Sequence, residues 1–268
     1  FVIKQGSDGS LTSGINEFVW VPVSDSSEMF GTDAQGNSLG KLYTNWSNSS
    51  GPQPYNWTET EGVMSWTATS GSGSYREPDI LKEYDGNDAT DDSSYFTSAI
   101  GNITGAAFKA QLQQEFEDMR ESVETYGGFY IGRYETGGLS GTAVVQKNNT
   151  DINNKNWYEM YQKCKTIVQE TETLKGTTSM IWGCQWDATL KWFLTSSNSE
   201  VVNYVTDSTG KGNYSGTNGN QPIPTGQNDN YSVNNIYDMA GNVYDWTLEA
   251  NSNNTRVIRR RQLQLFRF

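Results

Sequence analysis

The stretch NIYDMAGNVYDW, residues 235–246, is the most informative part of the chain. Large side chains surround Gly241, and an isolated glycine within such a run marks a turn or a close approach of the backbone. Aromatic and β-branched residues follow in residues 243–250, as they do in strands. The stretch therefore predicts a glycine-broken turn that leads directly into a strand.

Periodic apolar residues predict one long helix upstream of this turn. Residues 106–128 contain five apolar residues at helical spacing, namely Phe108, Leu112, Phe116, Met119 and Val123. Gly127 and Gly128 follow them, and glycine commonly ends a helix. We expect the helix to end at these glycines.

Shorter patterns predict two further helices and several strands. Residues 156–170 and 184–196 have helical spacing, whereas residues 16–23 and 129–138 alternate as strands do. A short strand is also expected within residues 62–69. The pattern predicts an α+β fold, in which two to three helices pack beside an irregular antiparallel sheet with long loops.

Composition excludes several classes of protein. The 268 residues carry a net charge of −12, which repels the phosphates of nucleic acids, and no histidine is present to serve as general base or metal ligand. The chain contains no apolar run of membrane-spanning length and no signal peptide, and its start at Phe1 is expected for a processed or trimmed form. The polar, aromatic-rich, lysine-poor composition favours an extracellular, cell-surface or virion location.

Two cysteines, Cys164 and Cys184, leave three alternatives open. They cannot by themselves form a four-ligand zinc site. We favour two buried thiols over a disulfide bridge, and a bridge over a catalytic pair.

Aromatic and acidic residues provide weaker candidates for a site. Seven aromatic residues lie in or beside the two later helices and favour core packing over a sugar-stacking groove: Trp157, Tyr158, Tyr161, Trp182, Trp186, Trp192 and Phe193. Five carboxylates could form catalytic pairs, although their spacing does not fix any separation: Glu135, Asp187, Asp238, Asp245 and Glu249. Residues 85–92, DGNDATDD, depart from the EF-hand pattern at Ala89 and Thr90 and predict a solvated acidic loop.

The opening motif resembles the N-hydrophobic-x-D-M-x-G-N-V-W-E-W pattern of the formylglycine-generating-enzyme-like (sulfatase-modifying-factor) proteins, a branch of the C-type lectin fold. Four other segments resemble segments of that family, in the same order. The first strand corresponds to EFVWVPV and the FYIxxYEVT strand to GGFYIGRYETGG. The SWxDAxxYC helix corresponds to NWYEMYQKCK and the LPTEAEWEYA helix to MIWGCQWDATLKWF. The resemblance covers most of residues 16–259. It implies a single domain over residues 1–268, with a loop-rich insertion at 24–105 and an atypical tail at 256–268.

The resemblance does not extend to the family's catalysis. Formylglycine-generating enzymes carry their catalytic cysteine pair downstream of the GNVWEW motif, and this chain has no cysteine after Cys184. Cys164 and Cys184 match helix positions instead. We therefore expect no copper-thiolate oxidation chemistry and no catalytic residues of that kind.

Other members of the family carry calcium near the same turn. Asn242 and Asp245 are the matching oxygen donors, although aspartate in place of glutamate has a shorter reach. A structural calcium ion at these two residues and a hydrogen-bonded turn without metal are both open.

A narrower resemblance is to bacterial and phage ligand-display proteins that diversity-generating retroelements diversify. In these variable proteins the GNVWEW strand is followed by RVxRGGxY and a segment rich in Tyr, Ser, Asn and Gly, which forms the binding face. RVIR, residues 256–259, matches that pattern, whereas RRQLQLFRF, residues 260–268, replaces its continuation. Tyr244, Trp246 and Arg256 are the candidate ligand-binding residues.

The basic tail suggests a change of reading frame. One permitted codon string for it is CGG CGG CAG CTA CAG CTC TTC CGG TTC, and skipping its first base gives Gly-Gly-Ser-Tyr-Ser-Ser-Ser-Gly, the continuation that the family leads us to expect. We expect a frame change before Arg260. The alternative is a short terminal strand through Leu263, Leu265 and Phe266.

The resemblance implies a non-enzymatic ligand-binding or display protein on a bacterial or phage surface, with its variable segment lost or frame-changed. Its partner would be an unidentified protein or glycan. One alternative is an enzyme related to the formylglycine-generating oxidases or a carbohydrate-active protein. Another is a structural subunit of a pilus or phage fibre.

Overall fold

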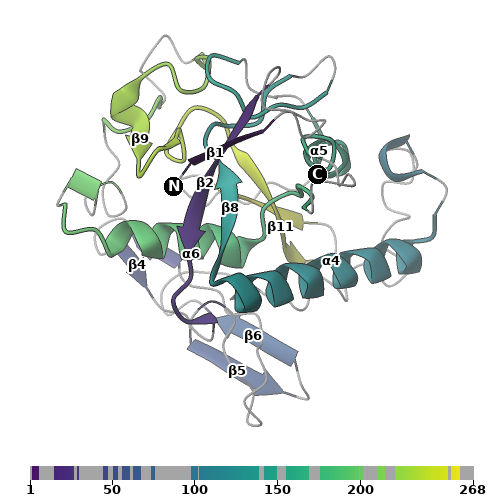
Figure 1. The fold of residues 1–268 in the computed structure, drawn as a ribbon. Helices are drawn as coiled ribbons and strands as arrows, with labels where there is room; N and C mark the ends of the chain where they lie inside the picture. Colours follow the sequence, from purple (N-terminus) through teal and green to yellow (C-terminus); the bar gives the residue numbers. More distant parts are fainter. Residues whose placement is uncertain are drawn as a thin grey trace.

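The computed structural model describes residues 2–5, 15–26, 29, 45–47, 51–53, 56–60, 63–67, 74–75, 98–101, 103–138, 142–149, 155–168, 176–198, 200–201, 204, 210–214, 221–252 and 255–259. The protein is a mixed α+β structure with small antiparallel sheets and few helices (Figure 1). The coarse fold class expected from the sequence is therefore confirmed. The acidic loop at 85–92 and the tail at 260–268 lie outside the described residues.

A three-stranded antiparallel sheet organises the N-terminal half. Its order is β1 (Val2–Gln5), β2 (Asn16–Pro22) and β8 (Gly128–Gly132). The strand predicted at 16–23 is thus confirmed, whereas the strand predicted at 129–138 ends at Gly132 because the chain bends at residues 133–134. Beyond the end of β8, the bend is still hydrogen-bonded to β2, from Arg133 N to Glu17 O at 2.9 Å.

The long helix α4 (Gly105–Tyr126) forms where the apolar periodicity predicted it. Thr104 caps its start, because the Thr104 hydroxyl accepts a hydrogen bond from Ala107 N at 3.1 Å. Gly127 ends it with a left-handed φ of 72° and donates its N–H to Val123 O. Four of the five periodic residues are buried and Met119 is partly buried, so the predicted apolar face is confirmed.

The other two predicted helices are α5 (Trp157–Cys164) and α6 (Gly183–Leu194). A capping box of Asn156 and Glu159 starts α5. The helix is shorter than the predicted 156–170, because the hydroxyls of Thr166 and Thr178 donate hydrogen bonds to the Lys163 and Cys164 carbonyls and the chain turns there.

The core lies on both faces of the β2–β8 pair. Val19, Val21 and Phe129 point into the main cluster, to which α4, α5 and α6 contribute. Phe18 belongs to a second, smaller cluster with Tyr134, residues of the loops that follow, and Tyr237 of the later β-hairpin. Five of the seven aromatic residues near the later helices are buried and the other two are partly buried, which confirms core packing for this set.

The C-terminal part is built of short hairpins. The 3₁₀ helix η3 (Asp229–Tyr231) precedes β9 (Ser232–Val233) and β10 (Ile236–Tyr237), and a turn then leads into β11 (Asp245–Ser252), which pairs with β12 (Thr255–Arg259). The predicted glycine-broken turn before a strand is confirmed.

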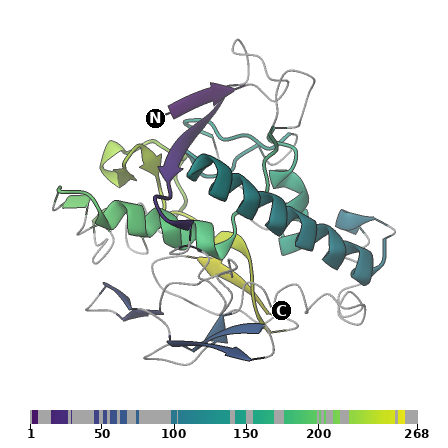
Figure 2. The same cartoon turned by 60° about the horizontal axis from the view of Figure 1, so that its bottom comes forward.

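Five further short strands lie in the region predicted to be loop-rich. They are β3 (Asn45–Ser47), β4 (Gly51–Gln53), β5 (Asn56–Thr60), β6 (Val63–Thr67) and β7 (Ser74–Tyr75). The strand expected within 62–69 is β6. Strand β7 contacts β11, and Figure 2 shows the short strands on the same side of the molecule as the β11–β12 pair.

Candidate functional site

The turn between β10 and β11 has an unusual backbone. Asp238, Gly241 and Asn242 all have left-handed φ values, of 60°, 89° and 57°. A Cβ atom at Gly241 would lie 2.8 Å from the backbone N and O of Asn213, so only glycine fits there. The turn is therefore pressed directly onto the segment around Asn213.

The side chain of Asn242 binds this turn to three other parts of the chain. Its Oδ1 accepts hydrogen bonds from Asn213 Nδ2 at 3.0 Å and from Ile223 N at 2.9 Å. Its Nδ2 donates to Glu135 Oε2 at 2.7 Å and to Ile223 O at 3.0 Å. Four hydrogen bonds are the capacity of a side-chain amide, and Glu135 Oε1 also accepts from Val243 N at 3.4 Å.

Asp238 is a buried carboxylate beside the same turn. Its Oδ2 accepts hydrogen bonds from the Thr225 hydroxyl at 3.0 Å and from Gly226 N at 2.8 Å. Oδ1 is also buried and has no hydrogen-bond donor among the residues that the structure describes. Burial raises the pKa of Asp238, and the hydrogen bonds from Gly226 and Thr225 oppose that shift.

Two of the five candidate residues, Glu135 and Asp238, are linked through the Thr225 hydroxyl, which meets the backbone of Glu135 and the carboxylate of Asp238. Thr225 Oγ1 accepts from Glu135 N at 3.1 Å while it donates to Asp238. Both carboxylates are buried and hold the turn in place. Asp187, on α6, is buried as well, and the side chain of Glu249 lies outside what the structure describes.

The calcium prediction concerned Asn242 and Asp245. Asn242 Oδ1 is used by two N–H donors, as expected for the hydrogen-bonded form of the turn, and a cation would have to replace at least one of them. Within the described ranges, no group of three or more His, Cys, Asp or Glu residues is arranged to hold a metal ion. Calcium binding at Asn242 and Asp245 stays a prediction.

The three candidate ligand-binding residues differ in their surroundings. Tyr244 is 38% exposed on the turn. Trp246 packs against the core, and its indole N–H donates to Lys155 O at 3.3 Å. Arg256 is a β12 residue whose backbone pairs with Ala250, and its side chain is not among those described.

The two cysteines are buried thiols, with no disulfide between them. Burial raises the pKa of the Cys164 thiol to about 12, and the charge of Asp245 adds to the shift. A thiol that stays protonated is a poor nucleophile and a poor metal ligand. The expectation of two buried thiols is confirmed.

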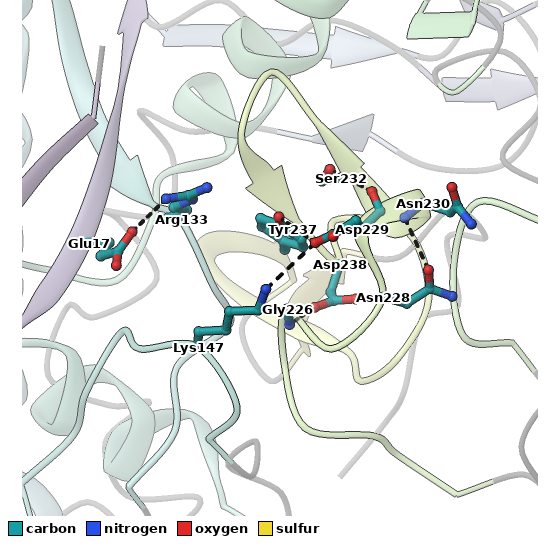
Figure 3. Close-up of polar contacts among 10 residues, drawn as sticks. All are labelled: Glu17, Arg133, Lys147, Gly226, Asn228, Asp229, Asn230, Ser232, Tyr237 and Asp238. Carbon is teal, nitrogen blue, oxygen red and sulfur yellow. Dashed lines mark hydrogen bonds and ion pairs between the residues drawn. The ribbon is translucent and has the colours of Figure 1, made fainter.

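Sequence reasoning missed one polar cluster, which Figure 3 shows. Arg133 Nη1 lies 2.6 Å from Glu17 Oε2, and Lys147 Nζ lies 3.6 Å from Asp229 Oδ1. Tyr237 donates its hydroxyl hydrogen to Asp229 Oδ1 at 2.9 Å. The aromatic ring of Tyr237 lies 5.6 Å from the guanidinium carbon of Arg133 and 5.9 Å from Lys147 Nζ.

This cluster joins the bend after β8 to the β9–β10 hairpin. Arg133 also lies over the ring of Tyr134, at 5.4 Å, and the Tyr134 and Tyr237 rings are 5.1 Å apart. Each of the two cations lies next to a carboxylate. The alternation of Arg133 against Tyr134 in the sequence was the only signal of this cluster.

No protein-family model, curated protein or solved structure matches the chain. None of the helices that the structure describes is long and apolar enough to span a membrane.

Proposed function

We propose that the chain is a non-enzymatic ligand-binding or display protein of a bacterial or phage surface. In this proposal it has one domain of the C-type lectin type, close to the formylglycine-generating-enzyme branch. The order of the sequence motifs supports it, as does the α+β structure with its hydrogen-bonded turn at Asn242. An enzyme is disfavoured because the chain has no histidine and no cysteine after Cys184.

The observation that carries the proposal is the exposed ring of Tyr244 on a fixed turn. Asn242 and Val243, the two residues before it, are hydrogen-bonded to Glu135, and β11 begins at the residue after it. Rigid aromatic anchors of this kind give binding surfaces a large contact area at low entropic cost. The partner would be a protein or a glycan.

The proposal includes the frame change before Arg260. Strand β12 ends at Arg259, so the proposed variable segment would continue from a strand that already pairs with β11. The gene sequence tests this step directly. Codons for residues 260–268 that cannot shift into GGSY would contradict it.

The decisive binding experiment compares the chain with a version in which the GGSY frame is restored. Both are screened on a glycan array and in pull-downs. We expect the restored version to bind a ligand, and Tyr244→Ala in it to weaken binding about tenfold or more. Tyr126→Ala, at an exposed tyrosine at the end of α4, is the control and should leave this binding unchanged.

Three outcomes would contradict the proposal. Absence of binding by both versions would remove the display function. A bound metal with an open coordination position between Asn242 and Asp245 would favour an enzyme. Filaments in light scattering or electron microscopy would favour a pilus or fibre subunit.

A further inference from the structure

An aromatic pair lies on the face of the β2–β8 sheet that is remote from the main core. The strand register places Trp20 directly opposite Tyr130, and cross-strand partners share one face of a sheet. Phe18, two residues earlier on the same face, is covered by the second hydrophobic cluster. Tyr130 is not covered in this way, because it is 42% exposed.

Gly128 leaves the space that the side chain of Trp20 occupies. A Cβ atom there would lie 2.5 Å from Cζ2 and 2.8 Å from Cε2 of the Trp20 indole. The indole therefore occupies the space that any side chain at position 128 would need. Trp20, Tyr130 and Gly128 together form what we call the aromatic corner.

The two rings of the aromatic corner meet at an angle. Their centroids are 5.0 Å apart and their planes are inclined by 64°. The indole of Trp20 packs against the backbone at Gly128, and the ring of Tyr130 lies beside it at an angle. Because both residues are on paired strands, the corner is fixed before any ligand arrives.

Both rings keep an unused polar group. In the part of the chain that the structure describes, neither the Trp20 indole N–H nor the Tyr130 hydroxyl makes a hydrogen bond to another protein group. Tyrosine and tryptophan side chains combine an apolar ring with a polar end. The corner thus offers apolar contact and two hydrogen-bonding groups to one small ligand.

We propose that the aromatic corner binds one ring of a neutral saccharide. A pyranose has a face of C–H groups that stacks on an aromatic ring and a rim of hydroxyls that would meet the Trp20 N–H and the Tyr130 hydroxyl. The net charge of −12 disfavours anionic ligands, so an uncharged sugar suits this surface better than an anionic one. This proposal does not involve Tyr244, on which the proposed display function rests.

Two other occupants use the corner less completely. A quaternary ammonium ion would be attracted to the rings but would leave both hydrogen-bonding groups unused. A proline-rich peptide needs a series of aromatic grooves along its length, and the corner is the size of one ring. A saccharide uses the stacking surface and both polar groups.

The test is calorimetric titration of the full chain with cellohexaose, maltohexaose and chitohexaose. We expect at least one of them to bind. Tyr130→Ala should weaken that binding about tenfold, since it removes one of the two rings of the corner. Tyr130→Phe and Trp20→Phe, which keep a ring and lose one polar group, should each weaken it about fivefold.

Ile103→Ala is the matched control, because Ile103 is 39% exposed, close to the 42% of Tyr130, and belongs to neither proposed binding site. It should leave hexasaccharide binding unchanged. Failure of all three sugars to bind would overturn the proposal. So would binding that survives Tyr130→Ala, or binding of decaproline or choline in place of the sugars.

Discussion

Asn242 fixes the turn before β11 through both halves of its side-chain amide. The oxygen accepts two hydrogen bonds and the nitrogen donates two, one of them to the buried carboxylate of Glu135. Its backbone is left-handed, with φ of 57°, a region that asparagine tolerates better than most residues. One residue type therefore meets two separate requirements, one of conformation and one of hydrogen bonding.

Asn242→Ala should lower the free energy of unfolding by about 3 kcal/mol more than Asn235→Ala does. Both positions have positive φ, 57° and 69°, so the backbone cost is shared. The difference between the two variants therefore measures the free-energy cost of leaving the hydrogen-bond partners of Asn242 unpaired. Urea unfolding followed by tryptophan fluorescence measures it. Equal losses in the two variants would show that the amide contacts contribute little.

Asp238 should give the stability of the fold a pH dependence in the acid range. Because burial raises its pKa in the folded state, its contribution is fully present below the ordinary aspartate pKa of about 4 and is lost as the pH rises through the folded-state value. Asp238→Asn keeps an acceptor for Thr225 and Gly226 and removes the titration.

We therefore expect the Asp238→Asn variant to be tolerated at pH 7 without loss of stability. Relative to the unchanged protein, the free energy of unfolding of the variant should rise between pH 3 and pH 7, because the contribution that Asp238 loses over this range has been removed. Urea unfolding between pH 3 and pH 7 measures both. A difference between the two proteins that stays constant over this range would mean that Asp238 titrates normally.

At the scale of elements, two glycines connect α4 to β8, and each is needed for a different physical reason. Gly127 adopts a φ of 72° and has only Val23 O, at 3.8 Å, near the position of an added Cβ. Gly128 needs no left-handed conformation, but its Cβ would lie 2.4 Å from Val21 O and inside contact distance of Trp20. The first glycine is required by conformation and the second by space.

Gly127→Ala should therefore cost about 1 kcal/mol of stability, from backbone strain alone. Gly128→Ala should cost about 3 kcal/mol, because backbone and indole would both have to move. It should also change the near-ultraviolet circular dichroism that the indole of Trp20 contributes. Chemical unfolding of the two variants in parallel checks the order, and a larger loss for Gly127→Ala would contradict it.

At the scale of the whole molecule, the β2–β8 pair is the wall between two hydrophobic clusters. The main cluster holds three helices against one face, and the smaller cluster covers part of the other. The Arg133 cluster closes the smaller side by joining β2, the bend after β8 and the β9–β10 hairpin (Figure 3). Segments more than one hundred residues apart in the chain meet there, as the separation of 116 between Arg133 and Glu17 shows.

A double-mutant cycle measures how strongly Arg133 and Glu17 are coupled across this contact. Arg133→Met with Glu17→Gln should give a coupling energy of about 1 kcal/mol or more, since both side chains are largely shielded, at 21% and 15% exposed. Lys147→Met with Asp229→Asn is the matched control. That pair is 45% and 79% exposed, so solvent screening should keep its coupling below about 0.5 kcal/mol. Similar couplings would argue against a role for burial.

The elements that the sequence predicted well are those fixed by neighbouring residues. Helix α4, its end at Gly127 and the buried face of Phe108 and Leu112 follow from spacing within one segment. Helix α5 was predicted too long, because its end depends on Thr178, which lies 14 residues after the Cys164 carbonyl that it binds. Helix length was therefore decided by a contact that the local pattern does not contain.

The same division holds for the candidate sites. The sequence by itself determined the α+β class, the charge of −12, the absence of histidine and the position of the turn at Gly241. Only the tertiary structure decided that Asn242 meets Glu135, 107 residues away, and that Trp20 lies against Gly128. The reason is physical: residue type fixes what a side chain can bond to, whereas chain closure fixes which groups come within reach.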